Sequence, residues 1–358
     1  MRVRAIDLFC GAGGLTWGLQ EAGIEVISGY DFNPLCAYPY AENTGARFEE
    51  CDLSTPDIDR MAADLDADGP TLIAGCAPCQ RFSTYDRLRR GSGDAWPLLD
   101  AFGSAVAMIR PDYVTMENVP GLERDPAFAR FHGALIGAGY QVTYDVLDCR
   151  RYGVPQARKR LVLIASLHGF VGLPDPTHTK DDPRVSVRSR IADLPALRSG
   201  EIDSGDRLHA AATMSDINLK RIRASRPGGT WLDWPEHLRA PCHRKASGVK
   251  FMSVYGRMEW DRSAPTITGQ ANGFGNGRFG HPEQDRAITL REAALLQTFP
   301  PSYIFFDPKD PINLSKIGEM IGNAVPPKLG EAIGSHIVAH ATGIWRTSGV
   351  ELNADPKI

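Results

Sequence analysis

Short apolar segments alternate with amphipathic segments over the first half of the chain. Such an alternation predicts strands that are separated by helices. The predicted strands are 4–9, 25–30, 71–74, 113–116, 140–147 and 160–165, and the predicted helices are 15–22, 34–43 and 99–109. Elements in this order predict an α/β fold with a doubly wound, mostly parallel sheet.

The alternation stops at about Leu167 and does not resume before Tyr255. Prolines and scattered glycines interrupt this middle stretch, so we expect no long regular element there. It carries Trp231, Trp234 and Phe251 as core material, which favours a smaller, irregular domain over a partly disordered insertion.

These patterns predict how the chain is organised. We expect a larger domain at 1–168, the smaller domain at 169–255, and a return segment at 256–358 that completes both. The return segment contains a strongly amphipathic predicted helix at 289–298 and a final predicted helix at 328–341.

Composition limits the class of protein only loosely. With 42% hydrophobic and 23% charged residues the chain is typical of globular proteins, which excludes neither an enzyme nor a binding protein. No apolar run approaches the roughly 18–20 residues of a membrane span, and the N-terminus lacks the apolar core of a signal peptide. We therefore expect a cytoplasmic protein with no membrane attachment, whose seven cysteines are reduced.

The net charge of −3 conceals an uneven distribution. Residues 1–80 carry four basic and 13 acidic side chains, a balance of −9, and the remainder of the chain therefore carries +6. This favours a neutral or cationic cofactor in the first part and a polyanionic partner elsewhere, with ordinary surface scatter as the alternative.

The first predicted strand leads into a glycine-rich turn, Asp7-Leu8-Phe9-Cys10-Gly11-Ala12-Gly13-Gly14. Its glycines permit close backbone approach, and the following helix presents free N–H groups. The spacing differs from the dinucleotide pattern G-x-G-x-x-G, so a pyrophosphate is not required. Asp31, at the tip of the next strand, is placed to bind ribose hydroxyls, and Asp52 follows at the expected third strand position. Taken alone, the turn is equally compatible with cofactor binding and with a purely structural role.

A second group follows the strand 71–74, in Cys76-Ala77-Pro78-Cys79-Gln80-Arg81-Phe82-Ser83. The pair Cys76 and Cys79 could form a redox dithiol or half of a zinc site. The sequence has no second C-x-x-C, and no His-x(3–5)-His follows Cys79 at the spacing of a zinc finger, so we expect no metal. Cys79 leads into a loop in which residues 80–93 carry four arginines and one aspartate, where a small core residue would be out of place. It is therefore a candidate nucleophile.

Two more polar groups occur at strand ends. Glu117-Asn118-Val119 follows an apolar strand, and a carboxyl at that depth is either satisfied by backbone or works as an acid or base. Gln156-Ala157-Arg158-Lys159-Arg160 sets two arginines two residues apart, so we expect them to point the same way, toward a site or a phosphate; a solvated edge is the alternative. Ligands of open α/β sheets bind beyond the carboxyl ends of the strands, which is where these groups and the glycine turn fall.

In this order the motifs resemble those of the cytosine-5 methyltransferase family, through nearly the whole chain outside the middle stretch. Arg257 with Ala264-Pro265-Thr266-Ile267-Thr268 resembles the segment that organises the recognition domain. Ile321-Gly322-Asn323-Ala324-Val325-Pro326-Pro327 resembles the last motif, which returns to the cofactor. One departure is visible, since Cys76-Ala77 stands where the family usually has glycine and a bulkier residue.

The resemblance implies a methyl transfer from S-adenosylmethionine to carbon-5 of a flipped-out cytosine in double-stranded DNA. The implied catalytic residues are Cys79, as nucleophile on carbon-6, Glu117, at ring nitrogen-3, and Arg158 and Arg160, at the carbonyl oxygen of the base. The implied cofactor-binding residues are Phe9, Gly11, Gly13, Gly14, Asp31, Phe32, Asp52, Leu53, Pro78, Asn323 and Ala324. The implied DNA-binding residues are Gln80, Arg81, Ser83, Arg87, Arg89, Arg90 and Arg257.

The resemblance also suggests a biological setting. Residues 1–168 would form the catalytic and cofactor-binding domain, and 169–255 the target-recognition domain. The protein would act as a monomer, as the modification half of a restriction–modification pair with a cognate endonuclease acting on the same site. The alternatives are the RNA-methylating branch of the family, a catalytically silent DNA-binding relative, and a redox protein with a Cys76–Cys79 pair.

Overall fold

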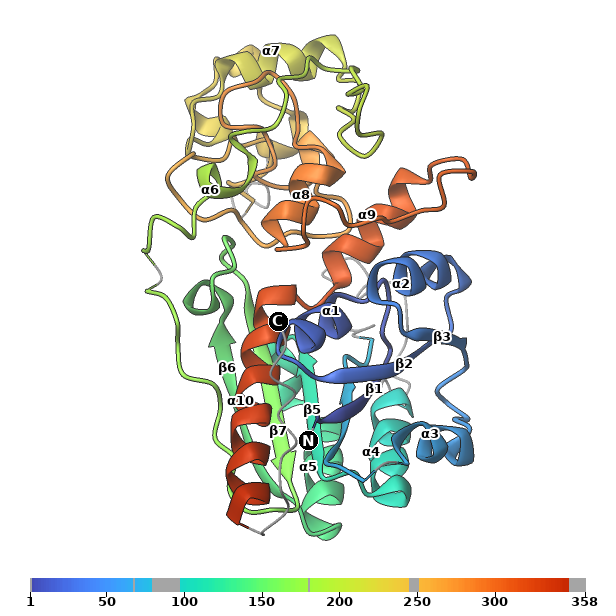
Figure 1. Ribbon diagram of the computed structural model, residues 1–358. Coiled ribbons are helices and arrows are strands. Elements are labelled where there is room, and N and C mark those ends of the chain that lie inside the picture. Colours follow the sequence, from blue (N-terminus) through green and yellow to red (C-terminus); the bar gives the residue numbers. More distant parts are fainter. Residues whose placement is uncertain (1, 67, 79–96, 180, 245–250, 348–358) are drawn as a thin grey trace.

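The computed structural model describes residues 2–66, 68–78, 97–179, 181–244 and 251–347. One seven-stranded sheet has the order β3-β2-β1-β4-β5-β7-β6 (Figure 1). Its strands are β1 (Arg4–Leu8), β2 (Glu25–Asp31), β3 (Arg47–Glu50), β4 (Thr71–Gly75), β5 (Tyr113–Asn118), β6 (Gln141–Asp148) and β7 (Lys159–Ser166). The α/β sheet predicted from the alternation is confirmed.

The direction of winding reverses between β1 and β4. Strand β1 pairs in parallel with both β2 and β4, and β4 pairs in parallel with β5. The chain therefore winds outward from the centre in both directions, and the loops after β1 and β4 diverge at a topological switch point. Backbone contact joins them there, because the Cys76 N–H donates to the Leu8 carbonyl oxygen at 3.2 Å.

Strand β7 is the one that breaks the parallel pattern, because it runs antiparallel to both β5 and β6. Between β6 and β7 the chain contains only the short 3₁₀ helix η4 (Cys149–Tyr152). A parallel return needs a crossover, usually through a helix, so this short connection forces a reversal.

The described helices of the sheet layer are α1 (Gly14–Glu21), η1 (Pro34–Cys36), α2 (Ala37–Thr44), α3 (Ile58–Leu65), α4 (Pro97–Ile109), η3 (Pro120–Arg124), α5 (Pro126–Gly137) and α10 (Pro327–Thr347). Helices α3 and α5 were absent from the prediction, although the sequence signals both. Asp57 and Asp125 each accept a hydrogen bond from a backbone N–H of the first turn, and Pro126 occupies the first helical position.

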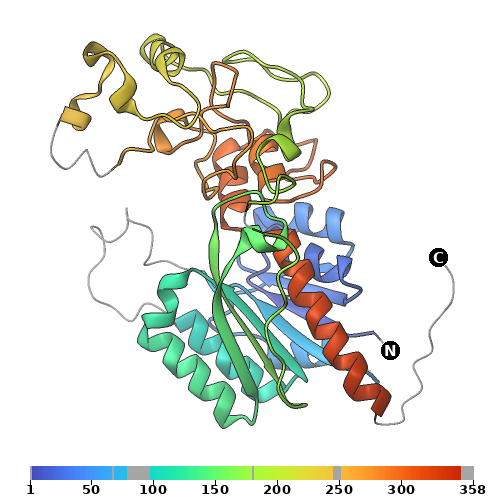
Figure 2. The same ribbon diagram turned by 90° about the vertical axis from the view of Figure 1, so that its left-hand side faces the viewer.

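Helices cover both faces of the sheet. On one face Leu15 of α1 and Ile333 of α10 pack with Ala5 of β1, and on the other Phe102 of α4 and Phe131 of α5 pack around the sheet. Figure 2 shows α10 crossing the sheet in this layer. Because both faces are covered, the central strands β1, β4 and β5 are buried along nearly their whole length, as is usual for parallel sheets.

The upper part of the molecule in Figure 1 consists mainly of loops and short helices. Its described helices are α6 (Arg188–Ile191), α7 (Asp216–Ala224), η5 (Trp231–Asp233), η6 (Glu236–Leu238), η7 (Pro241–Arg244), η9 (Phe274–Asn276) and α8 (Leu290–Leu296), and α9 (Leu314–Asn323) leads back to the sheet layer. Trp231 and Trp234 are buried as expected. The expectation for Phe251 is wrong: its side chain is 57% exposed, and Trp231 Nε1 binds only its carbonyl oxygen.

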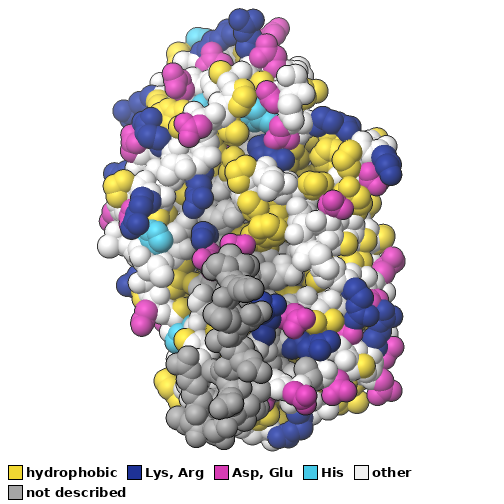
Figure 3. Space-filling model, in the orientation of Figure 1, with side chains coloured by type: hydrophobic (Ala, Val, Ile, Leu, Met, Phe, Trp, Pro, Cys, Tyr) yellow, Lys and Arg dark blue, Asp and Glu magenta, His cyan; other side chains and the backbone are white. Residues whose placement is uncertain are grey.

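Charges of both signs are interspersed on the face shown in Figure 3, over the upper and the lower parts alike. The uneven charge distribution along the sequence therefore does not become a single-sign field on this face. Among the helices that the structure describes, none has the length and apolar character needed to cross a bilayer.

Helix α8 is not amphipathic, contrary to the expectation, because all of its residues are buried. Glu292 is held by both terminal nitrogens of Arg286, at 2.7 Å each, and by the Thr289 N–H at 2.7 Å in a capping box. Arg286 and Glu292 are both fully buried, and Arg291 pairs with Asp206. The two charged residues of this buried helix, Arg291 and Glu292, are tolerated because each one has a partner of opposite charge.

Breaking the Arg286–Glu292 pair from one side should destabilise the upper part strongly. Arg286→Met leaves a buried carboxylate without its partner, so we expect the free energy of unfolding to fall by about 3–5 kcal/mol. The matched control is Lys316→Met, which removes a half-exposed pair with Glu319 and should cost roughly 0–1 kcal/mol. Urea unfolding followed by tryptophan fluorescence measures both; equal losses would contradict the interpretation.

Candidate active site

The glycine turn after β1 contains three residues with positive φ. Phe9, Gly11 and Gly13 have φ values of 58°, 53° and 91°. A Cβ on Gly11 would meet no atom within 4 Å, whereas one on Gly14 would lie 2.5 Å from the Val325 carbonyl oxygen. Gly11 therefore leaves open space at the strand end, and Gly14 allows the turn to pack tightly against the C-terminal part of the chain.

Asp31 ends β2 beside this turn. Its Oδ2 accepts a hydrogen bond from the Gly11 N–H and its Oδ1 accepts one from the Asn33 N–H, both at 2.9 Å. Burial raises the pKa of Asp31 above its ordinary value, while backbone hydrogen bonds oppose the shift. Each oxygen of a carboxylate has a second lone pair, so Asp31 can still accept hydrogen bonds from a diol.

The segment after β3 lies next to Asp31, since the Cys51 N–H donates to the Asp31 carbonyl oxygen at 3.0 Å. It brings Asp52, which is exposed, and Leu53, which is buried, to the same strand ends. A hydrogen bond from the Ser54 N–H lowers the pKa of Asp52. Phe32, at 67% exposure, presents an uncovered aromatic ring beside them.

The remaining predicted cofactor residues border this group. Phe9 is half-buried, with its ring 6.3 Å from that of Phe102. Asn323 ends α9 and is exposed, and Ala324 follows it in the segment that packs against Gly14. The structure thus brings the glycine turn, Asp31 and the Asn323 turn to one edge of the sheet.

Glu117 lies in β5 near the switch point and is 3% exposed. Its Oε1 is 2.9 Å from Nε of Arg160, and its Oε2 accepts a hydrogen bond from Sγ of Cys76 at 3.1 Å. The register explains the first contact: Glu117 lies opposite Val162, so Arg160, two residues earlier in β7, is its diagonal neighbour on the same face.

The chain leading to the predicted nucleophile is anchored by the residue after Glu117. Asn118 donates from Nδ2 to the Ala77 carbonyl oxygen at 2.8 Å, and both residues are buried. Pro78, next along the chain, is partly buried. The predicted site residues Cys79, Gln80, Arg81, Ser83, Arg87, Arg89 and Arg90 lie outside the described residues.

Arg158 and Arg160 lie within electrostatic reach of each other and of Glu117, but they bind different partners. Arg158 is 1% exposed, and its Nη1 donates to the Ile267 carbonyl oxygen at 3.0 Å. Its Nη2 donates to the carbonyl oxygens of Gly322 and Ala324, both at 3.1 Å. Burial lowers the pKa of Arg158 to about 10, which leaves the group charged at neutral pH.

Two glutamines extend this network of buried polar side chains. Gln156 donates from Nε2 to the Leu296 carbonyl oxygen at 3.0 Å and accepts from the Ile267 N–H at 3.0 Å. It also binds Gln297, which donates in turn to the Ala324 carbonyl oxygen at 2.7 Å. The network of Gln156, Arg158 and Gln297 joins β7, the upper part and the Asn323 turn.

Arg257 requires a correction, because it was predicted to bind DNA. It is 5% exposed, and all three of its guanidinium nitrogens bind the protein. Nε donates to the carbonyls of Ile222 and Ser225, Nη1 to those of His281 and Gln284, and Nη2 to Asp285. Arg257 therefore holds the segments of the upper part together, and its burial and its partners keep it from a phosphate at the surface.

Sequence reasoning missed what three residues of the site do. Cys76 donates to Glu117, Asn118 anchors Ala77, and Gln297 binds the Ala324 carbonyl oxygen. The first two sit at strand ends beside predicted site residues, which is the only signal that the sequence offers for them. Gln297 contacts Gln156 across 141 positions of the chain, so its role depends entirely on tertiary packing.

Asp7 is a buried carboxyl just before the glycine turn. Its Oδ2 accepts a hydrogen bond from the Thr16 hydroxyl at 2.7 Å, and its Oδ1 is buried with no hydrogen-bond partner. Burial, more than the nearby charge of Asp31, raises the pKa of Asp7 to about 7. The strand end therefore carries a carboxyl that ionises near neutral pH.

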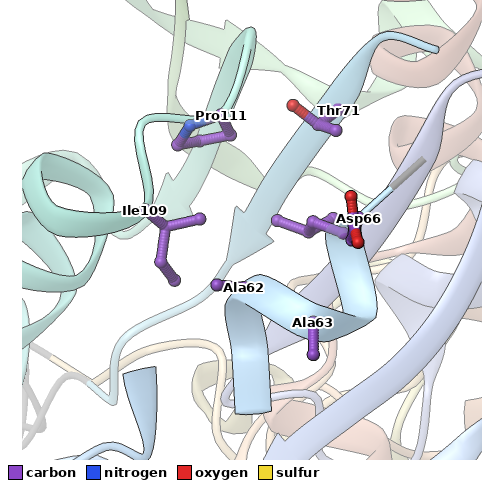
Figure 4. Close-up of a pocket in the computed structure, with 7 residues that line it drawn as sticks. Ala62, Ala63, Asp66, Thr71, Ile109 and Pro111 are labelled. Carbon is purple, nitrogen blue, oxygen red and sulfur yellow. The ribbon is translucent and has the colours of Figure 1, made fainter. Parts of the chain in front are cut away.

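A cavity of about 400 Å³ lies at the opposite end of β4, between α3 and the end of α4. Figure 4 shows Asp66, Thr71, Ile109 and Pro111 around it. The five residues of β4 span about 16 Å, which separates this cavity from the strand ends where the site residues gather. Among the described residues, no group of three or more His, Cys, Asp or Glu side chains is suited to hold a metal ion.

Comparison with known proteins assigns the class of enzyme. The model of the C-5 cytosine-specific DNA methylase family matches residues 3–339. The chain is 48% identical to the type II methylase M.HgiDII of Herpetosiphon aurantiacus, over 97% of this chain and 98% of that protein. It is 30% identical to a type II methyltransferase of Haemophilus parahaemolyticus, over 94% of this chain and 87% of that protein. The chain therefore belongs to the C-5 cytosine-specific DNA methylase family.

The fold agrees with this assignment. A solved structure described as a DNA modification methyltransferase, encoded within an E. coli prophage, superposes with a TM-score of 0.68 at 21% identity. The match covers 95% of this chain and 99% of that one. The protein is thus a DNA (cytosine-5)-methyltransferase, and S-adenosylmethionine is its cofactor.

The residues at the strand ends suit this cofactor. The open space at Gly11, a carboxylate with free lone pairs at Asp31 and the exposed ring of Phe32 provide room, hydrogen-bond acceptors and an apolar surface for a nucleoside. Negative side chains at this edge favour a cationic sulfonium compound over a phosphate-bearing nucleotide. Which of these residues contact the cofactor stays a prediction.

The structure predicts that Arg158 contributes more than Arg160 to the free energy of unfolding, because Arg158 binds backbone carbonyls of distant segments and Arg160 contacts the side chain of Glu117. Arg158→Lys replaces a fork bound to three carbonyls by a single ammonium, so the free energy of unfolding should fall by about 2–4 kcal/mol. Arg160→Lys keeps a cation near Glu117 and removes no fork bound to distant carbonyls, so it should cost less than Arg158→Lys. Denaturant unfolding of both variants tests this, and a larger loss for Arg160→Lys would refute it.

The raised pKa of Asp7 predicts a pH dependence of stability. Between the ordinary carboxyl value of 3.8 and about 7 the folded state binds a proton that the unfolded state has lost, so stability from this group decreases as pH rises through that window. Asp7→Asn removes the titration. The stability of the variant relative to wild type should therefore be higher at pH 8 than at pH 5, by up to about 3 kcal/mol. A pH-independent difference would show that Asp7 titrates normally.

Proposed function

We propose that this methyltransferase is the modification enzyme of a type II restriction–modification system and methylates cytosine within one specific double-stranded DNA sequence. The similarity to type II methylases over nearly the full chain supports the assignment. The structural observation behind the proposed chemistry is the buried Glu117 carboxylate, bracketed by Arg160 and Cys76 next to the segment that leads to Cys79.

The chemical problem is that carbon-5 of cytosine is a poor nucleophile within an aromatic ring. In the proposed mechanism the Cys79 thiolate adds to carbon-6, which breaks the aromaticity and makes carbon-5 enamine-like. The bound cofactor supplies an electrophilic sulfonium methyl group. Once carbon-5 has taken the methyl group and the sulfonium has become a neutral thioether, a base removes the carbon-5 proton, with water as the candidate. The electron pair of that C–H bond re-forms the double bond and expels the Cys79 thiolate, which restores the aromatic ring.

Glu117 and Arg160 act on the base itself in this proposal. Glu117 hydrogen-bonds or protonates ring nitrogen-3, where negative charge develops as the thiolate adds. Arg160, in contact with Glu117, is the nearer of the two predicted arginines to this carboxylate and binds the carbonyl oxygen of the base. Arg158 is a positioning residue, because its Nη1 and Nη2 already bind backbone carbonyls, while its Nε is buried with no hydrogen-bond partner.

The cofactor would lie against the glycine turn, with Asp31 on its ribose and Asp52 on its adenine amino group. Phe9, Phe32 and Leu53 would contact the adenine, while Gly13, Gly14, Pro78, Asn323 and Ala324 would border the methionine part. The target base must leave the duplex to reach this edge, at a cost of a few kcal/mol.

The wider setting is also a proposal. Residues 1–168 would form the catalytic domain and 169–255 the target-recognition domain, with 256–358 completing both. The loop residues Gln80, Arg81, Ser83, Arg87, Arg89 and Arg90 would contact DNA. The enzyme would act in the cytoplasm as a monomer, alongside a cognate endonuclease that recognises the same site.

The proposal is tested by expressing the chain in a host that lacks cytosine methylation. Bisulfite sequencing of plasmid DNA should show protected cytosines in one short sequence context for the wild type. Cys79→Ala should lose at least about a thousandfold in methylation, because no covalent route remains, while cofactor binding by calorimetry persists. Uniform conversion with folded wild-type protein, or full activity of Cys79→Ala, would refute the mechanism.

A further inference from the structure

Cys76 is a residue whose side chain touches the catalytic carboxylate but has no role in the proposed chemistry. It follows the last residue of β4, and its backbone is fixed by the hydrogen bond to Leu8 of β1. Its Sγ lies 3.1 Å from Oε2 of Glu117. Strand pairing between β4 and β5, which sets Gly75 opposite Met116, brings the two side chains together at the switch point.

The thiol is a donor in this contact and not a second nucleophile. Burial, reinforced by the negative charge of Glu117, raises the pKa of Cys76 well above its ordinary value. A protonated thiol has one S–H to donate, and Oε2 of Glu117 is its acceptor. The two cysteines of the C-x-x-C motif therefore have different roles in the proposal: Cys76 is a protonated thiol, whereas Cys79, as the nucleophile, requires the thiolate form.

Glu117 is held from two sides that differ in strength. Arg160 faces Oε1 with a permanent charge, whereas Cys76 binds Oε2 with a neutral and intrinsically weak donor. A carboxylate that is 3% exposed cannot rely on water to satisfy Oε2. The weak S–H donor satisfies Oε2 in the free enzyme. Because this hydrogen bond is weak, an N–H group of the substrate can later displace it with little loss of free energy.

We propose that Cys76 is a positioning residue, whose S–H holds Oε2 of Glu117 oriented toward the base site and yields it to the cytosine ring. The inference rests on the proposed role of Glu117 at the base. It gives a function to the position at which this chain departs from the family pattern.

The experiment compares Cys76→Ala with Cys76→Ser in steady-state methyl transfer to DNA that contains the target sequence found by bisulfite mapping. Cys76→Ala removes the donor and should lower kcat about tenfold, the effect of one hydrogen bond to a charged group, with little change in KM for DNA. Cys76→Ser keeps a donor and should retain kcat within about threefold. Cys149→Ala, which removes a buried thiol from the same domain, is the matched control and should leave kcat unchanged.

A double-mutant cycle separates positioning from packing. If Cys76 acts through Glu117, Cys76→Ala in the Glu117→Gln background should lower the remaining rate less than about twofold. Equal losses for Cys76→Ala and Cys76→Ser, an additive loss in the double variant, or wild-type kcat for Cys76→Ala would each overturn the inference. A Glu117→Gln variant with wild-type kcat would instead refute the proposed role of Glu117, and is measured independently.

Discussion

Backbone carbonyls from distant segments converge on one buried guanidinium, that of Arg158. It binds Ile267 from the upper part together with Gly322 and Ala324 from the turn after α9. A buried cation is costly unless most of its donors are matched, and the Nη1 and Nη2 donors of Arg158 are matched only by these segments, while its Nε has no partner. The position of the Asn323 turn, and with it the edge of the cofactor site, depends on this constraint.

The same constraint explains the tight packing at the start of the chain. The Asn323 turn brings the Val325 carbonyl so close to Gly14 that no Cβ fits between them. Residues separated by about three hundred positions thereby share one wall of the site. The glycine turn after β1 would leave one side of the site open. The Asn323 turn packs against it and supplies that side.

At the neighbouring strand ends a negative charge is buried instead. Glu117 has Arg160 on one oxygen and the Cys76 thiol on the other, so its orientation is set by β7 and β4 together. The antiparallel course of β7 is essential here, since it runs the strand past Glu117 with Arg160 as a diagonal neighbour. Arg158 and Glu117 are buried in the same region, where the negative charge of Glu117 partly offsets the positive charge of Arg158.

The sequence by itself determined most of the strands and helices, though not α3 and α5, together with the sheet class and the candidate residues at the strand ends, because local periodicity and strand-end motifs are encoded over a few adjacent positions. Cys79, Glu117 and the glycine turn could be selected on that basis. The directions of Arg158 and Arg257 could not: both were expected to face ligands, and both bind backbone carbonyls of segments far away in the chain. The same holds for Gln297 and for the thiol of Cys76, whose partners are chosen by strand order and chain closure. Only the tertiary structure decides which charge is buried against which partner, because that choice depends on desolvation and on contacts that no local pattern contains.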